Sequence, residues 1–136
     1  MNNISPSLKP GLIRFWAAID LCVGIGMLMP PFASAFIALL YTLNGLVGGT
    51  TAAPTFDAIH WLFVYLTGAL TVTWAVARLL HPISLLAVVD GWARLWVAGV
   101  LAYAMLGLGA PSVLWLFVLT ESAGGVVQLG AAYRKA

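Results

Sequence analysis

The chain consists largely of long apolar segments that end at residues which stop a helix. A helix that crosses about 30 Å of hydrocarbon needs about 20 mostly apolar residues. Four segments approach or exceed that length, and they cover residues 12–29, 58–80, 86–109 and 112–133. The pair Pro30-Pro31 ends the first, because proline lacks an N–H donor and clashes with the preceding turn. Asp57 and Ser112 stand where an N-cap residue accepts backbone N–H bonds. The pattern predicts an all-α fold, a four-helix bundle integral to a membrane.

A fifth apolar segment, residues 32–47, is shorter and is followed by a glycine-rich break. It forms either a fifth span or a re-entrant or interfacial helix. The basic residues decide, because Lys and Arg gather in short cytoplasmic loops. With four spans and residues 32–47 on the outer side, all six cations fall on the cytoplasmic side. With five spans, only Lys9 and Arg14 remain there.

We therefore predict one transmembrane domain over residues 1–136, with four spans and both termini cytoplasmic, in a bacterial-type inner membrane. Residues 32–47 form a short outer, interfacial or re-entrant helix. The first turns of the third span should lie in the inner headgroup region. We therefore expect the Arg94 side chain to extend from the hydrocarbon to those headgroups.

Composition excludes several classes of protein. Hydrophobic residues make up 62% of the chain and charged residues only 7%, against about 25% charged in a typical soluble domain. The single cysteine, Cys22, excludes thiol–disulfide exchange within one chain and a cysteine zinc site, and we expect it to be buried. His60 and His81 lie about 31 Å apart along one helix, so they cannot share a haem iron. We predict no cofactor, no metal and no nucleic-acid partner, since the cations are scattered and topology explains them.

Five polar residues within the predicted spans form the candidate site: Asp20, Asp90, Arg94, Glu121 and Gln128. Each intramembrane charge costs about 2.5–3.5 kcal/mol, so these residues belong inside the bundle. Asp90 and Arg94 are spaced i,i+4 and should form an ion pair that Asp20 or Gln128 reaches. With Arg78, three acids meet two arginines, and Glu121, deepest in its span, is the acid left over. The group either fastens the bundle or forms a site that binds a polar head or moves a proton.

Three further patterns carry candidate chemistry. Asp57 and His60 form a candidate outer site, either a helix cap with an interfacial histidine or an acid–base or metal pair. In the second span a polar face should point into the bundle, and its members are His60, Thr67, Thr71, Trp74 and Arg78. In the third span an aromatic stripe predicts core packing, an interfacial anchor, or a wall for a sterol, quinone or terpenoid: Trp92, Trp96, Gly99 and Tyr103.

The chain also resembles a family. The carrying residues are Arg14-Phe-Trp, Gly24 and Gly26 before the proline pair, then Asp57-Ala-Ile-His60-Trp-Leu-Phe-Val and a span closed by His81-Pro82. This order is similar to that of small DoxX-like and BphX-like four-helix membrane proteins. The resemblance implies a four-helix membrane fold and an association with quinone-linked oxidation or catabolic systems. It assigns no catalytic residue.

Three functions are compatible with these patterns. The first is an accessory membrane component that binds lipid, an apolar small molecule or a quinone, alone or in a homo-oligomer or larger complex. The second is a membrane-embedded isomerase or hydrolase that uses intramembrane acids on an apolar substrate. The third is a small proton-coupled exporter that works as a dimer, with Glu121 as its membrane carboxylate.

Overall fold

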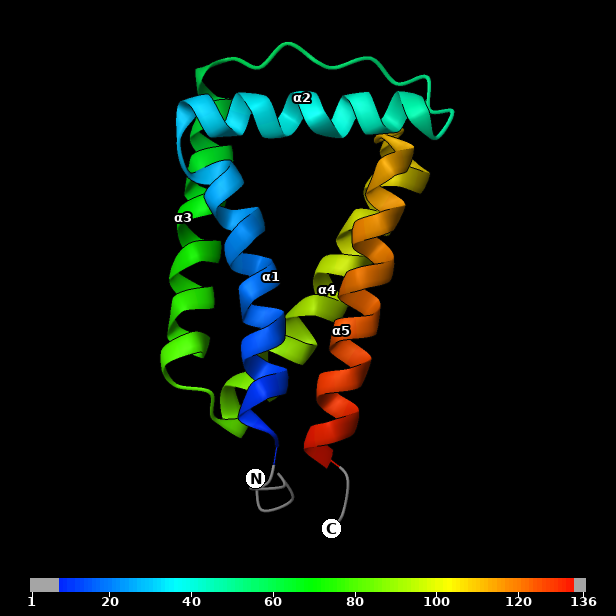
Figure 1. The fold of residues 1–136 in the computed structure, drawn as a ribbon. Coiled ribbons are helices and arrows are strands. Elements are labelled where there is room, and N and C mark those ends of the chain that lie inside the picture. Colours follow the sequence, from blue (N-terminus) through cyan, green and yellow to red (C-terminus); the bar gives the residue numbers. More distant parts are fainter. Residues whose placement is uncertain (1–7, 134–136) are drawn as a thin grey trace.

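The computed structural model describes residues 8–133 and is helical throughout most of that range (Figure 1). The elements are α1 (Pro10–Leu28), α2 (Pro30–Leu46), α3 (Ala58–Leu80), α4 (Ser84–Leu108), the short 3-10 helix η1 (Ser112–Leu114) and α5 (Trp115–Tyr133). No strand occurs within the described range. Among the described residues, four segments are long and apolar enough to span a membrane: α1, α3, α4 and η1 with α5. The helix bounds therefore agree with the first three predicted segments to within two residues, and η1 with α5 covers the fourth. The cations Arg134 and Lys135 lie outside the described residues.

The long helices pack as two pairs, α1 with α3 and α4 with α5. Glycines bring the backbones of each pair together. A Cβ atom on Gly68 of α3 would lie 2.6 Å from the Met27 carbonyl carbon of α1. A Cβ atom on Gly125 of α5 would lie 2.8 Å from the Gly91 oxygen of α4. Each pair is therefore a closely packed unit, as expected where small residues line helix contacts in apolar surroundings.

The two pairs approach each other at one end and separate toward the other, where α2 lies across both (Figure 1). A single non-helical residue, Met29, separates α1 from α2, and Pro30 occupies the first turn of the new helix, where its missing N–H is harmless. The far end of α2 contacts η1, and residues 47–57 return over α2 to the start of α3. The short helix predicted at residues 32–47 is thus present, slightly longer, and transverse to the four long helices.

The caps of two helices differ from each other. The Asp57 carboxylate accepts a 3.0 Å bond from the His60 backbone N–H, which confirms the predicted cap of α3. The predicted cap at Ser112 is wrong. Ser112 follows Pro111 directly into the 3-10 turn, and no side chain caps that turn.

Three expectations about helix faces differ from the structure, one in whole and two in part. Cys22 is exposed, because it lies opposite the face of α1 that carries Ile13, Ala17 and Gly24. The aromatic stripe of α4 is exposed, with Trp96 at 77%, so core packing is wrong for it. The interfacial anchor and the wall for an apolar molecule stay predictions.

Within residues 8–133, Trp74 and Arg78 are the members of the polar face of α3 that hydrogen-bond to the other pair. Thr67 and His60 lie nearer the α2 end, where the pairs separate, and both are exposed.

Candidate functional site

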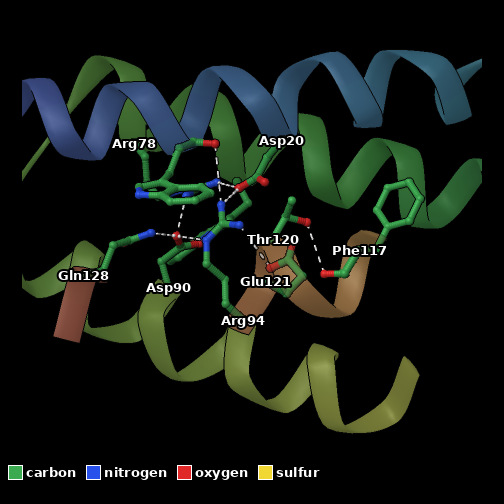
Figure 2. Close-up of polar contacts among 10 residues, drawn as sticks. Asp20, Arg78, Asp90, Arg94, Phe117, Thr120, Glu121 and Gln128 are labelled. Atoms are coloured by element: carbon green, nitrogen blue, oxygen red, sulfur yellow. Dashed lines mark hydrogen bonds and ion pairs between the residues drawn. The ribbon is translucent and has the colours of Figure 1, made fainter. Parts of the chain in front are cut away.

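The five predicted residues and Arg78 meet between the two helix pairs (Figure 2). We call this group the charge cluster, and its members are Asp20 from α1, Arg78 from α3, Asp90 and Arg94 from α4, and Glu121 and Gln128 from α5. Every long helix thus contributes at least one polar side chain to a single network. The physical reason is the cost on which the sequence prediction rested. A charge in apolar surroundings is unfavourable unless it contacts another charge or a dipole.

Arg78 joins three helices and is completely buried. Its Nη1 donates to Asp90 Oδ2 at 2.6 Å, and its Nη2 donates to Asp20. The Trp74 ring lies 5.6 Å from the guanidinium carbon. Only Nε of Arg78 has no hydrogen-bond partner among the described residues.

Arg94 is equally enclosed, with 4% of its side chain exposed. Its Nε donates to Asp90 Oδ2 at 2.9 Å and its Nη1 to Glu121 Oε2 at 3.0 Å. Its Nη2 donates to Asp20, and the Trp16 ring lies 5.0 Å from the guanidinium carbon. The expectation that Arg94 reaches outward to headgroups is therefore wrong, because three carboxylates hold it inside.

Asp90 is the acceptor at the centre of the cluster. Besides both arginines, it accepts from Trp74 Nε1 at 2.7 Å and from Gln128 Nε2 at 2.8 Å. The predicted ion pair of Asp90 with Arg94 is confirmed, and both Asp20 and Gln128 reach that pair.

The cluster is the main connection between the two helix pairs. Most contacts between helices fall within α1/α3 and within α4/α5, and few residues of one pair touch the other. The links of the cluster that cross from pair to pair within the described residues join Arg78 and Trp74 to Asp90, and join Arg94 to Asp20 and to the Trp16 carbonyl. Coulombic attraction is stronger where the surroundings have a low dielectric constant, so a few such links hold two apolar units together.

The acids are more accessible than the arginines. The side chains of Asp20 and Glu121 keep 15% and 19% of their surface exposed, against 0% for Arg78 and 4% for Arg94. Asp20 Oδ1 and Glu121 Oε1 accept no hydrogen bond from the described residues, and Glu121 has one partner, Arg94. Both acids hold the same guanidinium, so their carboxylates are neighbours (Figure 2). The accessible part of the cluster therefore offers acceptor oxygens, while the guanidinium donors are enclosed.

The candidate outer site, Asp57 and His60, lies apart from this cluster. The two side chains are 65% and 59% exposed, and they form a reciprocal cap at the start of α3. The backbone N–H of His60 lowers the pKa of Asp57, so the cap persists above that pKa and is lost as the pH falls through it. No group of three or more His, Cys, Asp or Glu side chains among residues 8–133 is placed to hold a metal ion. The structure thus favours the helix cap over a metal role.

Two residues with structural roles were not identified from the sequence. Trp16 lies over Arg94, and nothing in its spacing marks it among the six tryptophans. Asn44 is fully buried in α2 and accepts a bond from the Val113 backbone N–H of η1. An amide within an apolar segment was a usable signal for Asn44, because such a group needs a partner.

No family model matches this chain, and the searches of curated proteins and of solved structures found no match either. The resemblance to DoxX-like and BphX-like proteins therefore stays a prediction.

Proposed function

We propose that this chain is a multi-pass membrane component of the DoxX-like type that binds a membrane amphiphile and carries out no reaction of its own. The polar head of that amphiphile meets Asp20 and Glu121, and its apolar part lies along the long helices. This proposal fits the cluster better than an enzyme, because the buried charges are occupied with one another.

One observation carries the proposal: the two acids are accessible midway along apolar helices while both arginines are enclosed. An anionic head would need accessible donors, but both guanidinium groups are enclosed and already donate to the acids. The free oxygens of Asp20 and Glu121 accept hydrogen bonds instead. The matching head is therefore an amine or another hydrogen-bond donor.

A long-chain amine tests this preference directly. We expect dodecylamine to bind saturably to the protein in zwitterionic nanodiscs, measured by calorimetry against protein-free discs, and dodecanoate not to compete. Glu121→Gln removes one charge and should weaken amine binding about ten- to a hundredfold, the usual weight of a hydrogen bond to a charged group. Its thermal stability should change little, because Gln retains an acceptor.

Thr120→Val is the matched control. Thr120 precedes Glu121, but its hydroxyl donates to the Phe117 carbonyl and does not touch the cluster (Figure 2). Amine binding should therefore equal that of the wild type. Equal binding of dodecylamine and dodecanoate, or full amine binding by Glu121→Gln, would contradict the proposal.

The membrane orientation is a second part of the proposal. We place both termini in the cytoplasm and α2 with residues 47–57 on the outer side, because all six cations then lie inside. The order of elements supports this, since α1 begins and α5 ends at the same end of the bundle, opposite α2 (Figure 1). In a Cys22→Ser background, an impermeant maleimide should label a cysteine at Thr50 in intact cells. It should not label one at Asn2 or Lys135, and labelling at either terminal position would refute the orientation.

A further inference from the structure

The helix α2 is attached firmly at its near end. It follows α1 after the single extended residue Met29, whose φ and ψ are −134° and 147°. The Phe36 ring packs beside Gly26 of α1, where a Cβ atom would lie 3.1 Å from that ring. Met29 is therefore the natural pivot between α1 and α2.

The far end of α2 has a different kind of attachment, centred on Asn44. The Asn44 side chain is fully buried, and its Oδ1 accepts a 3.2 Å bond from the backbone N–H of Val113 in η1. This bond joins α2, which continues from the α1/α3 pair, to the start of the α4/α5 pair. Apart from the charge cluster, it is the polar link between the two pairs within residues 8–133.

The fit around Asn44 depends on Gly49. The Gly49 backbone N–H donates to the Asn44 carbonyl at 2.8 Å, which folds residues 47–49 over the side chain. A Cβ atom on Gly49 would lie 2.5 Å from Asn44 Cγ, so only glycine allows the amide to sit there. Meanwhile Asn44 Nδ2 is buried without a hydrogen-bond partner. A buried donor without a partner is unfavourable, so the closed arrangement is stabilised less than a fully satisfied one would be.

We infer that α2 is a strap that opens at the contact between Asn44 and Val113 and pivots at Met29. When closed, it ties the two helix pairs together at the end where they separate, and the charge cluster ties them at mid-length. When open, it leaves the cluster as the remaining polar tie, so the pairs can separate and the approach to Asp20 and Glu121 widens. This control of access rests on the proposed function, whereas the strap itself does not.

Spin labels can measure the opening. In a Cys22→Ser background, labels at Thr42 on α2 and Leu116 on α5 report the distance between the strap and the second pair by pulsed electron resonance in nanodiscs. The wild type should give mainly one short distance. Asn44→Leu leaves the Val113 N–H without an acceptor, and Gly49→Ala displaces the amide. Each should raise the ratio of open to closed distances about five- to a hundredfold.

Gly45→Ala is the matched control, because a Cβ atom at Gly45 meets nothing within 4 Å. It should leave the distance distribution unchanged. A distribution that stays closed in both Asn44→Leu and Gly49→Ala would overturn the strap, as would equal opening in Gly45→Ala.

Dodecylamine binding by the same variants separates the strap from the proposed function. Faster binding in Gly49→Ala than in the wild type supports control of access. Opening with unchanged binding kinetics overturns that control and leaves the strap. Absence of amine binding in every variant overturns the proposed function alone.

Discussion

Replacing Arg94 with alanine is expected to lower the free energy of unfolding by about 3–5 kcal/mol, the range for removing one partner of a buried ion pair. Arg94 holds Asp20, Asp90 and Glu121 together, and it is almost completely enclosed. Without it, three carboxylates face Arg78 alone, and the main links between the helix pairs are weakened. Unfolding by increasing mole fraction of dodecyl sulfate in mixed micelles measures the loss.

Adding Asp90→Ala to this variant should recover part of the stability. The double variant removes one acid and one arginine, so the excess of one acid is the same as in the wild type, and Asp20 keeps Arg78 as its partner. Lys9→Ala serves as the control and should change the free energy of unfolding by less than about 0.5 kcal/mol, because Lys9 is exposed and outside the charge cluster. A double variant as unstable as Arg94→Ala, or less stable, would show that the stranded charge is not what destabilises the single variant.

The charge cluster could be predicted from the sequence because an unpaired charge in apolar surroundings is always unfavourable. An ionised side chain in a long apolar segment has few stable places, and all of them lie next to another charge or dipole. Asp20, Asp90, Arg94, Glu121 and Gln128 therefore converge as their positions predict. The helix bounds were equally accessible, since Pro30, His81-Pro82 and the glycines before Pro111 mark them clearly.

The outward or inward direction of apolar residues could not be predicted in the same way. In a membrane, an apolar side chain is stable both in the protein core and against lipid. The contrast between apolar buried faces and polar exposed faces, which marks helices of soluble proteins, is therefore absent. Cys22 was expected to be buried, core packing was one interpretation of Trp96, and both residues are exposed for this reason. Arg94 shows a related error, because its position in the first half of α4 favoured a reach toward the headgroups, while its carboxylate partners came from α1, α4 and α5.

The contacts of α2 escaped prediction because they join distant parts of the chain. The bond of Asn44 to Val113 connects residues 69 positions apart, and no local spacing encodes it. The aromatic ring of Trp16 over Arg94 is similar, since it depends on how α1 crosses α4. In each case the sequence shows at most that a group needs a partner. Which residue becomes that partner depends on the tertiary fold.

The last large effect concerns the glycine that brings α1 and α3 together. Gly68→Ala is expected to lower the free energy of unfolding by about 3 kcal/mol, at the upper end of the usual cost of overpacking. The added Cβ atom would lie 2.6 Å from the Met27 carbonyl carbon and 2.7 Å from the Leu28 nitrogen. Both are backbone atoms, so no side-chain rotation relieves the clash, and the two helices must move apart.

That movement should also reach the charge cluster, because Asp20 and Arg78 bind each other across the same pair of helices. We therefore expect Gly68→Ala to weaken dodecylamine binding as well as stability, both measured in the assays described above. Gly99→Ala is the control: a Cβ atom at Gly99 meets nothing within 4 Å, and alanine favours a helix over glycine by about 0.8–1.0 kcal/mol. Gly99→Ala should be at least as stable as the wild type and bind the amine equally. If Gly68→Ala matched it in both measurements, the close approach of α1 and α3 would not be what positions Asp20 against Arg78.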